Sequence, residues 1–255
     1  LTGDLHEPWL RSLSDDISDM RSRGQDVVVV TSGAVAIGRT ILNLKNKTLK
    51  LEEKQAAAAA GQLRLIEAYQ SALGIHGLTV AQILLTAEDT EDRRRHLNAR
   101  VTLDTLLQLG AVPVINENDT VATQEIRFGD NDRLASRVSA MIGADICVLL
   151  SDVDGLYTKD PALGMDAEHV PFVYEMSKEV IAMGGGVNQS YSYSTGGMAT
   201  KLMAAEICLN AGCHMAIAYG KPHSPISTLD KGARCTWFIS KVEPSAARKD
   251  WISRT

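Results

Sequence analysis

Apolar residues recur along the chain with two alternating periods, which predicts helices alternating with strands. The first helical pattern ends at Gly24, and its apolar positions, three or four residues apart, are Leu10, Leu13, Ile17 and Met20. Four consecutive valines then lie between Asp26 and Thr31. A strand that is apolar on both faces is typical of a parallel sheet covered by helices on both sides.

The same alternation continues to about residue 218. Further strands are expected at residues 78–85, 112–115, 146–150 and 214–218. Further helices are expected after the segment SGAVAIG and at residues 52–73, 86–107, 134–142 and 200–210. Thr86 and Asp89 have the spacing of a capping box at the start of one of them. The sequence therefore predicts an α/β fold with a mainly parallel sheet.

Polar segments follow the predicted strands, at the edge where parallel α/β sheets bind ligands. These segments are Thr31-Ser32-Gly33, Asn116 to Asp119, Ser151-Asp152 and Gly220-Lys221. The backbone amides of Ser32 and Gly33 and the hydroxyl of Ser32 suit a carboxylate or phosphate, although an ordinary helix cap would use the same residues. Ser151 and Asp152 suit a nucleotide, or Asp152 positions a lysine. Their shared placement is stronger support for a site than any one segment.

Acidic and amide side chains crowd residues 116–132, NENDTVATQEIRFGDND. Asp119 is expected to accept a hydrogen bond from a substrate ammonium group, with Asn116 orienting it. An Asx turn that satisfies its own backbone is the alternative. A second cluster, Asp130-Asn131-Asp132, follows 11 residues after Asp119 and favours the functional interpretation.

A glycine-rich segment, STGGMATK at residues 194–201, suits phosphate binding at the start of a helix. Its spacing is not that of a Walker A motif, so it does not predict a P-loop fold. The alternative is a helix N-terminus with a solvated Lys201, which the helix dipole disfavours. Residues 183–197, which overlap the start of this motif, are rich in Gly, Ser and Tyr. We expect them to form a flexible loop that is either a linker or, as we favour, a lid. With the acidic segment, this motif suggests phosphoryl transfer onto a small amine-bearing acid.

Composition excludes several classes of protein. The formal charge of −5 and the 5% of aromatic residues leave neither a basic surface nor many stacking platforms for nucleic acid. No apolar run reaches the roughly 18 residues of a membrane span, and no charged-then-apolar leader opens the chain. We expect a cytoplasmic protein that binds no membrane and, through this domain, no nucleic acid.

The cysteines and histidines do not predict a metal site. None of the four cysteines (Cys147, Cys208, Cys213 and Cys235) forms a C-x-x-C pair, and the six histidines lack ligand spacing. Reduced core thiols in a cytosolic protein are the simplest interpretation. We therefore assign no residue as a protein metal ligand.

Seven segments together resemble the glutamate 5-kinase family of the amino acid kinase superfamily. They are VVVVTSGAVAIG, QILLTAED, RRRHLNARVTL, VPVINENDTVA, FGDNDRLASRV, LLSDVDGLYTKDP and TGGMATK, colinear from about residue 5 to about residue 250. The segments INENDTVA and FGDND are specific to glutamate 5-kinases and are not shared by the superfamily at large. The resemblance implies a three-layer α/β/α sandwich that transfers the γ-phosphoryl group of ATP to the γ-carboxylate of L-glutamate, the first step of proline biosynthesis. Magnesium is implied as the companion of ATP.

The resemblance also implies a role for individual residues. Ser32, Gly33, Asn116, Asp119 and Asn131 would hold glutamate. Asp132 would organise the catalytic lysines, of which Lys201 is one. The nucleotide would contact Ser151, Asp152, Thr195, Gly196, Gly197, Met198 and Lys201. Feedback inhibition by proline is a frequent trait of the family, and we expect a homo-oligomer.

The expected organisation is one amino acid kinase domain at residues 1–240, with a substrate lobe to about residue 145 and a nucleotide lobe from about residue 146. The family opens with a strand bearing a V-K-x-G-S type motif, and this chain starts just after that position. Residues 241–255 are expected to be a tail or linker, where many bacterial members continue into a PUA domain.

Two other functions stay open from the sequence. One is an amino acid kinase that acts on a different acid. The other is a non-catalytic sensor that binds an amino acid or a nucleotide. A dehydrogenase is disfavoured, because no G-x-G-x-x-G motif follows the first strand.

Overall fold

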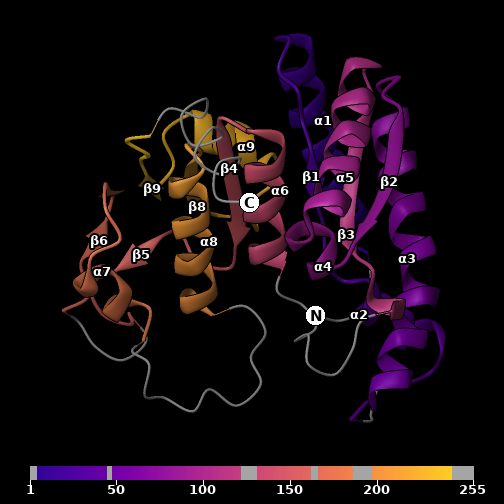
Figure 1. Ribbon diagram of the computed structural model, residues 1–255, viewed down its shortest axis with the longest axis horizontal. Helices are drawn as coiled ribbons and strands as arrows, with labels where there is room; N and C mark the ends of the chain where they lie inside the picture. Colours follow the sequence, from indigo (N-terminus) through magenta and orange to yellow (C-terminus); the bar gives the residue numbers. More distant parts are fainter. Residues whose placement is uncertain (1–4, 45–47, 122–130, 162–165, 186–196, 243–255) are drawn as a thin grey trace. The chain divides into compact units, whose positions relative to one another are not determined.

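The computed structural model describes residues 5–44, 48–121, 131–161, 166–185 and 197–242 (Figure 1). Contacts between Cα atoms divide the chain into two compact units, residues 1–131 and residues 132–255. Each unit contains its own parallel strands and its own helices.

The sheet of the first unit has the strand order β1-β3-β2, and both pairings are parallel. Its strands are β1 (Val29–Val30), β2 (Val80–Leu85) and β3 (Val112–Glu117). The central strand β3 is buried from Val112 to Asn116, on both faces of the sheet. The valines and isoleucine of this strand suit that double burial. All three strands end at the same edge, because they are parallel.

The helices of the first unit are α1 (Glu7–Ser22), α2 (Ala34–Ile41), α3 (Leu51–Gly74), α4 (Ala87–Glu91), α5 (Arg93–Gln108) and the 3-10 helix η1 (Asp119–Val121). Helix α3 packs against α1, α2 and β2, whereas α5 packs against β3 (Figure 1). The apolar stripe of α1 is buried at Leu10, Leu13 and Ile17, as the sequence period predicts.

Helices α2 and α3 approach each other closely through two glycines. A Cβ atom on Gly38 would lie 1.7 Å from the backbone oxygen of Ala57. A Cβ atom on Gly61 would lie 1.8 Å from the backbone oxygen of Ala34. Only glycine fits at either position, so the two backbones are in direct contact. This contact fixes the next residue of α3, Gln62, relative to α2.

The main sheet of the second unit has the strand order β4-β8-β9-β7. Its strands are β4 (Ile146–Ser151), β7 (Phe172–Val173), β8 (His214–Tyr219) and β9 (Cys235–Phe238). The β4–β8 and β7–β9 pairs are parallel, and β8–β9 is antiparallel. Strands β5 (Leu156–Tyr157) and β6 (His169–Val170) form a separate antiparallel pair.

The helices of the second unit are α6 (Asn131–Ile142, of which Asn131 is the last residue of the first unit), α7 (Lys178–Met183), α8 (Met198–Asn210) and α9 (Pro225–Asp230). Helix α8 supplies Leu202, Ala204, Ala205 and Cys208 to the core, where they meet buried residues of β4 and β8. Figure 1 shows α8 running alongside β8. All four cysteines are free and buried, with Cys147 on β4 and Cys208 on α8, so their prediction as core residues is confirmed.

Two expected elements differ from the structure. The first strand pairs only at Val29 and Val30, because β3 is its one hydrogen-bonded neighbour among the described residues. The helix expected at 86–107 is two helices, because Asp92 is extended (φ −70°, ψ 123°) and caps α5 by accepting from the backbone N–H of Arg95. The capping box of Thr86 and Asp89 is confirmed, at the start of α4.

Strand β9 was not predicted from the sequence. Its segment CTWF is only four residues long and has no clear alternation of apolar and polar positions. The strand is placed by pairing with β8 and β7 on its two sides, which no local pattern reveals.

Within the described part of the chain, no helix is long and apolar enough to cross a membrane.

The α2–α3 contact predicts opposite effects for two glycine substitutions on α3. Gly61→Ala should lower the free energy of unfolding by about 1–3 kcal/mol, because the new methyl group collides with backbone. Gly74→Ala, where a Cβ atom meets no described atom within 4 Å, should raise it by about 0.5–1 kcal/mol. Urea unfolding measures both. Equal effects at the two positions would contradict the close backbone contact.

Candidate functional site

The carboxyl end of β3 carries polar residues into the interior of the first unit. Asn116 is only 3% exposed and Asp119 only 8%. Strand β2 ends beside them, since the backbone N–H of Asn118 donates to the carbonyl oxygen of Leu85 (2.8 Å). Strand β1 ends there too, since the N–H of Thr31 donates to the carbonyl oxygen of Ile115 (2.9 Å). The polar segments therefore lie at the edge of the sheet that the sequence predicts.

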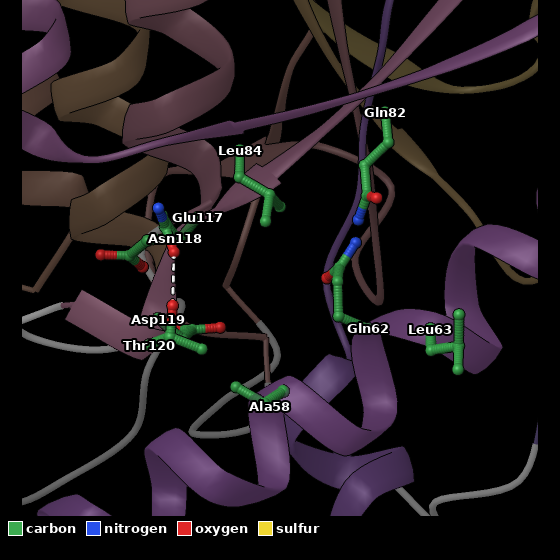
Figure 2. Close-up of a pocket in the computed structure, with 10 residues that line it drawn as sticks. Ala58, Gln62, Leu63, Gln82, Leu84, Glu117, Asn118, Asp119 and Thr120 are labelled. Atoms are coloured by element: carbon green, nitrogen blue, oxygen red, sulfur yellow. Dashed lines mark hydrogen bonds between the residues drawn. The ribbon is translucent and has the colours of Figure 1, made fainter.

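A pocket of about 310 Å³ opens at this edge (Figure 2). It is formed by α3, β2 and the segment that follows β3. Its lining consists of Ala58, Ala59, Gln62, Leu63, Gln82, Leu84, Glu117, Asn118, Asp119 and Thr120. The pocket combines small or apolar walls with two carboxylates and three carboxamides, which suits a small polar molecule.

Asn116 immediately precedes the pocket-lining residue Glu117, and its side-chain amide makes two hydrogen bonds. Its Oδ1 accepts from the backbone N–H of Glu117 (2.9 Å), and its Nδ2 donates to Oε1 of Gln62 (2.7 Å). The second bond joins the end of β3 to the middle of α3. Asn116 thus positions Gln62, whereas direct contact between Asn116 and a substrate stays a prediction.

Asp119 lines the pocket from η1 with a strongly perturbed carboxyl group. Burial raises its pKa to about 7, and the nearby negative charge of Glu117 contributes to the same shift. A cation in the pocket would lower the pKa of Asp119 again, because it stabilises the ionised form. Asn118 has a local partner, since Oγ1 of Thr120 donates to its Oδ1 (2.7 Å; Figure 2).

Ser32 and Gly33 follow β1 but do not line the pocket. Ser32 is exposed, and Gly33 caps α2 with φ of 102°, a left-handed conformation that favours glycine. A Cβ atom on Gly33 would meet none of the described atoms within 4 Å. The binding role of both residues stays a prediction.

Asn131 and Asp132 begin helix α6. Oδ1 of Asn131 is buried and has no hydrogen-bond partner among the described residues. Oδ2 of Asp132 accepts from Nζ of Lys201 (2.9 Å) and from Oγ1 of Thr200 (3.0 Å). Asp132 thus joins the start of α6 to the start of α8.

Lys201 is buried near the N-terminus of α8, with a side chain only 8% exposed. The alternative interpretation from the sequence, a solvated Lys201, is therefore wrong. Asp132 compensates the charge of the lysine inside the protein. Gly197 caps the helix and Met198 begins it. Thr195 and Gly196 lie outside the described residues.

The parallel strands β4 and β8 also end together, in the second unit. Ser151 is buried at the end of β4, and its hydroxyl donates to the exposed Asp152 (3.2 Å). The N–H of Gly220, which follows β8, donates to the carbonyl oxygen of Ser151 (2.7 Å). A Cβ atom on Gly220 would lie 2.9 Å from Cβ of Leu150, so this turn requires a very small residue.

A second pocket of about 190 Å³ lies beside the end of β8. Its lining consists of Asp154, Ala218, Tyr219, Pro222, Pro225, Thr228, Leu229, Ala233 and Arg234. Nζ of Lys221 lies 5.8 Å from the ring centre of Tyr219. The flat ring, the prolines and the two charged side chains suit a planar polar group.

Several of these residues were missed in the sequence. Gln62 follows a run of alanines on α3, and Ala58 and Gln62 share a helix face at the i, i+4 spacing. A long polar side chain on that otherwise small face is the signal that could have revealed it. Arg234 and Tyr219 left no comparable signal.

In the parts of the chain that the structure describes, no cluster of three or more His, Cys, Asp or Glu residues could hold a metal ion.

A sequence model of the amino acid kinase family matches residues 1–219. The chain is 59% identical over 251 residues to glutamate 5-kinase of Paramagnetospirillum magneticum, covering 98% of this chain and 67% of the relative. It is 54% identical over 248 residues to glutamate 5-kinase of Gluconobacter oxydans, covering 97% and 65%. The chain thus spans about two thirds of the length of these relatives.

Solved structures share the fold at much lower identity. The isopentenyl phosphate kinase of T. acidophilum superposes with a TM-score of 0.58 at 14% identity, covering 93% of both chains. UMP kinase from Ureaplasma parvum gives a TM-score of 0.60 at 14% identity, covering 91% of this chain and 88% of the other. These likenesses confirm the predicted α/β fold class.

The raised pKa of Asp119 predicts that Asp119→Asn stabilises the protein only at higher pH. In the unfolded chain this carboxyl titrates near pH 4, and in the folded protein near pH 7. The folded state therefore binds the extra proton, and stability falls as pH rises through that window. Unfolding free energies of wild type and variant should be nearly equal at pH 4 and should diverge in favour of Asp119→Asn by pH 8.

Two further substitutions control this experiment. Asp145→Asn, at an exposed carboxyl group of the second unit, is the control for the loss of one negative charge. Glu117→Gln should lower the pH at which Asp119 titrates, because it removes the neighbouring negative charge. A constant difference between Asp119→Asn and wild type from pH 4 to pH 8 would contradict the raised pKa.

Proposed function

The chain belongs to the glutamate 5-kinase family of amino acid kinases, and we propose that it transfers the γ-phosphoryl group of ATP to the γ-carboxylate of L-glutamate. In the cell this is the first step of proline biosynthesis. The observation that carries the proposal is Asp119, a buried carboxyl group that lines a pocket of about 310 Å³. An ammonium group bound there would restore its charge.

Glutamate binds in the pocket of the first unit with its ammonium group against Asp119. Glu117 adds a second negative charge to the same lining, and burial strengthens both interactions. The family resemblance assigns Ser32, Gly33 and Asn131 to glutamate as well, although these residues do not line this pocket. Asn116 contributes through the bond by which it holds Gln62.

ATP binds to the second unit. The pocket beside the end of β8 suits the base, and Ser151 and Asp152 lie at the end of the neighbouring strand β4. The amides at the start of α8, from Gly197 and Met198, suit the phosphates, because a helix N-terminus favours negative charge. Thr195 and Gly196 precede them and extend this phosphate segment.

Lys201 stabilises the charge that develops on the transferring phosphoryl group. The nucleophile is a carboxylate oxygen, which is already ionised, so the reaction needs no general base. It forms a bond to the γ-phosphorus while the bond from phosphorus to the bridging oxygen breaks and ADP leaves. Asp132 therefore has no proton to take, and its bond to Nζ instead holds the lysine in place.

Magnesium fits the oxygen ligands at the end of β4. The ion is usually held by one or two carboxylates together with phosphate oxygens, and does not require a cage made only of protein ligands. The exposed carboxylate of Asp152, beside the hydroxyl of Ser151, meets that requirement. When bound, the ion supplies charge neutralisation for the phosphates.

The proposal extends to the setting of the enzyme. We expect it to act in the cytoplasm as a homo-oligomer and to be inhibited by proline, which shares the α-ammonium and α-carboxylate of glutamate. The decisive experiment measures ADP release by the protein as the cell makes it, with ATP, magnesium and one acceptor. Glutamate should support turnover, whereas aspartate, acetylglutamate and UMP should not. Binding of glutamate without ADP release would favour the sensor instead.

Lys201→Ala should lower kcat by about two orders of magnitude or more, with little change in the KM for glutamate. Loss of one preorganised charge-stabilising group typically costs roughly 3–4 kcal/mol in the transition state. Lys178→Ala, in the exposed first turn of α7, is the matched control and should keep the wild-type rate. A folded Lys201→Ala protein with unchanged kcat would remove Lys201 from the mechanism.

Asp119→Ala should weaken glutamate binding about tenfold or more and leave the KM for ATP nearly unchanged. A charge-assisted hydrogen bond to an ammonium group contributes about 1.5–3 kcal/mol. Steady-state kinetics with each substrate varied in turn separates the two constants. Equal losses for glutamate and ATP would indicate that Asp119 is structural or serves the metal.

A further inference from the structure

The amide of Gln62 has only one orientation that its neighbours allow. The backbone N–H of Glu117 can only donate, so the side-chain atom of Asn116 that meets it must be Oδ1. Nδ2 of Asn116 is then the atom that faces Gln62, and it donates to Oε1 over 2.7 Å. Nε2 of Gln62 consequently points away from Asn116.

This nitrogen is a buried donor without a partner. Gln62 is 9% exposed, and Nε2 makes no hydrogen bond to any described residue. Figure 2 shows the amide of Gln62 extending into the pocket toward Gln82. A buried donor that has lost its water costs free energy unless something bonds to it. The position of Nε2 suggests that a ligand in this pocket supplies the acceptor.

The other polar groups of the pocket indicate the chemistry of that ligand. Asp119 and Glu117 suit a cation, whereas Nε2 of Gln62 suits an anion or another acceptor. Ala58, on the same face of α3 one turn earlier, leaves room beside the amide. An α-amino acid carries an ammonium group and a carboxylate on one carbon atom, so it can satisfy both sides of the pocket at once.

Building on the glutamate kinase function proposed above, we propose that Gln62 is a specificity residue whose Nε2 donates to the α-carboxylate of the substrate. Asp119 binds the ammonium group on the same carbon, and the γ-carboxylate is left free to react. Asn116 is the positioning residue, because its bond to Oε1 turns Nε2 toward the ligand. The pair thus selects acids that carry an α-carboxylate.

The test exchanges the donor for an acceptor without breaking the bond to Asn116. Gln62→Glu retains an oxygen that accepts from Nδ2 of Asn116 but faces the pocket with a second, negatively charged oxygen. Two ligands are compared, L-glutamate and its α-amide, isoglutamine, which keeps the ammonium group and the γ-carboxylate. Calorimetry without ATP measures both dissociation constants, and kinetics measures the KM for ATP.

Wild type should bind glutamate more tightly than isoglutamine. In Gln62→Glu the affinity for glutamate should fall about tenfold or more, since a charge-assisted bond is lost and two carboxylates repel each other. Isoglutamine can donate its α-amide N–H to the new carboxylate. The ratio of the isoglutamine dissociation constant to the glutamate dissociation constant should therefore be smaller than in wild type, or fall below one. The KM for ATP should stay unchanged.

Gln70→Glu is the matched control, because Gln70 is an exposed glutamine on the same helix and does not line the pocket. It should keep the wild-type preference, and melting temperatures check that both variants fold. If wild type binds glutamate but a folded Gln62→Glu protein keeps the wild-type preference for it, the role of Gln62 is overturned and the proposed function stands. If wild type binds no glutamate, the proposed function itself fails.

Discussion

The burial of polar groups at the end of β3 is the constraint on which the candidate substrate site depends. The strand is apolar from Val112 to Ile115 and then becomes polar while still inside the protein. Every polar group placed there must find a partner, since desolvation without a hydrogen bond is costly. Asn116 finds two partners, one of them on α3, and this bond connects the sheet to the helix that forms the pocket wall. Asp119 instead carries a raised pKa, and Nε2 of Gln62 has no described partner.

The second unit solves the same problem by pairing opposite charges. Lys201 is as buried as Asp119, yet Asp132 lies 2.9 Å from its ammonium nitrogen. A buried ion pair adds little net stability, but it fixes the geometry of both side chains. In the proposed reaction these two arrangements serve different purposes. The buried carboxyl group of Asp119 in the first unit suits a cation, whereas the paired lysine of the second unit is positioned for a transferring phosphoryl group.

Close backbone contact is what allows the pocket wall to be precise. Gly38 and Gly61 bring α2 and α3 together until their backbones touch, one residue before Gln62. A side chain that must present one nitrogen to a ligand needs a rigid helix beneath it. The run of alanines before Gln62 serves this packing and also leaves space in the pocket, so a segment that looks like plain core also shapes the site.

The sequence by itself determined the order of most helices and strands, the edge of the sheet at which polar segments gather and, through INENDTVA and FGDND, the family. Local periodicity and turn residues carry that information, because they depend on neighbours along the chain. The family resemblance already implied that Asp132 organises Lys201. Only the tertiary structure decided that Gln62 meets Asn116 across 54 residues and that β9 joins the second sheet. These contacts depend on which buried polar and apolar groups meet once distant segments pack together, and no local pattern records that.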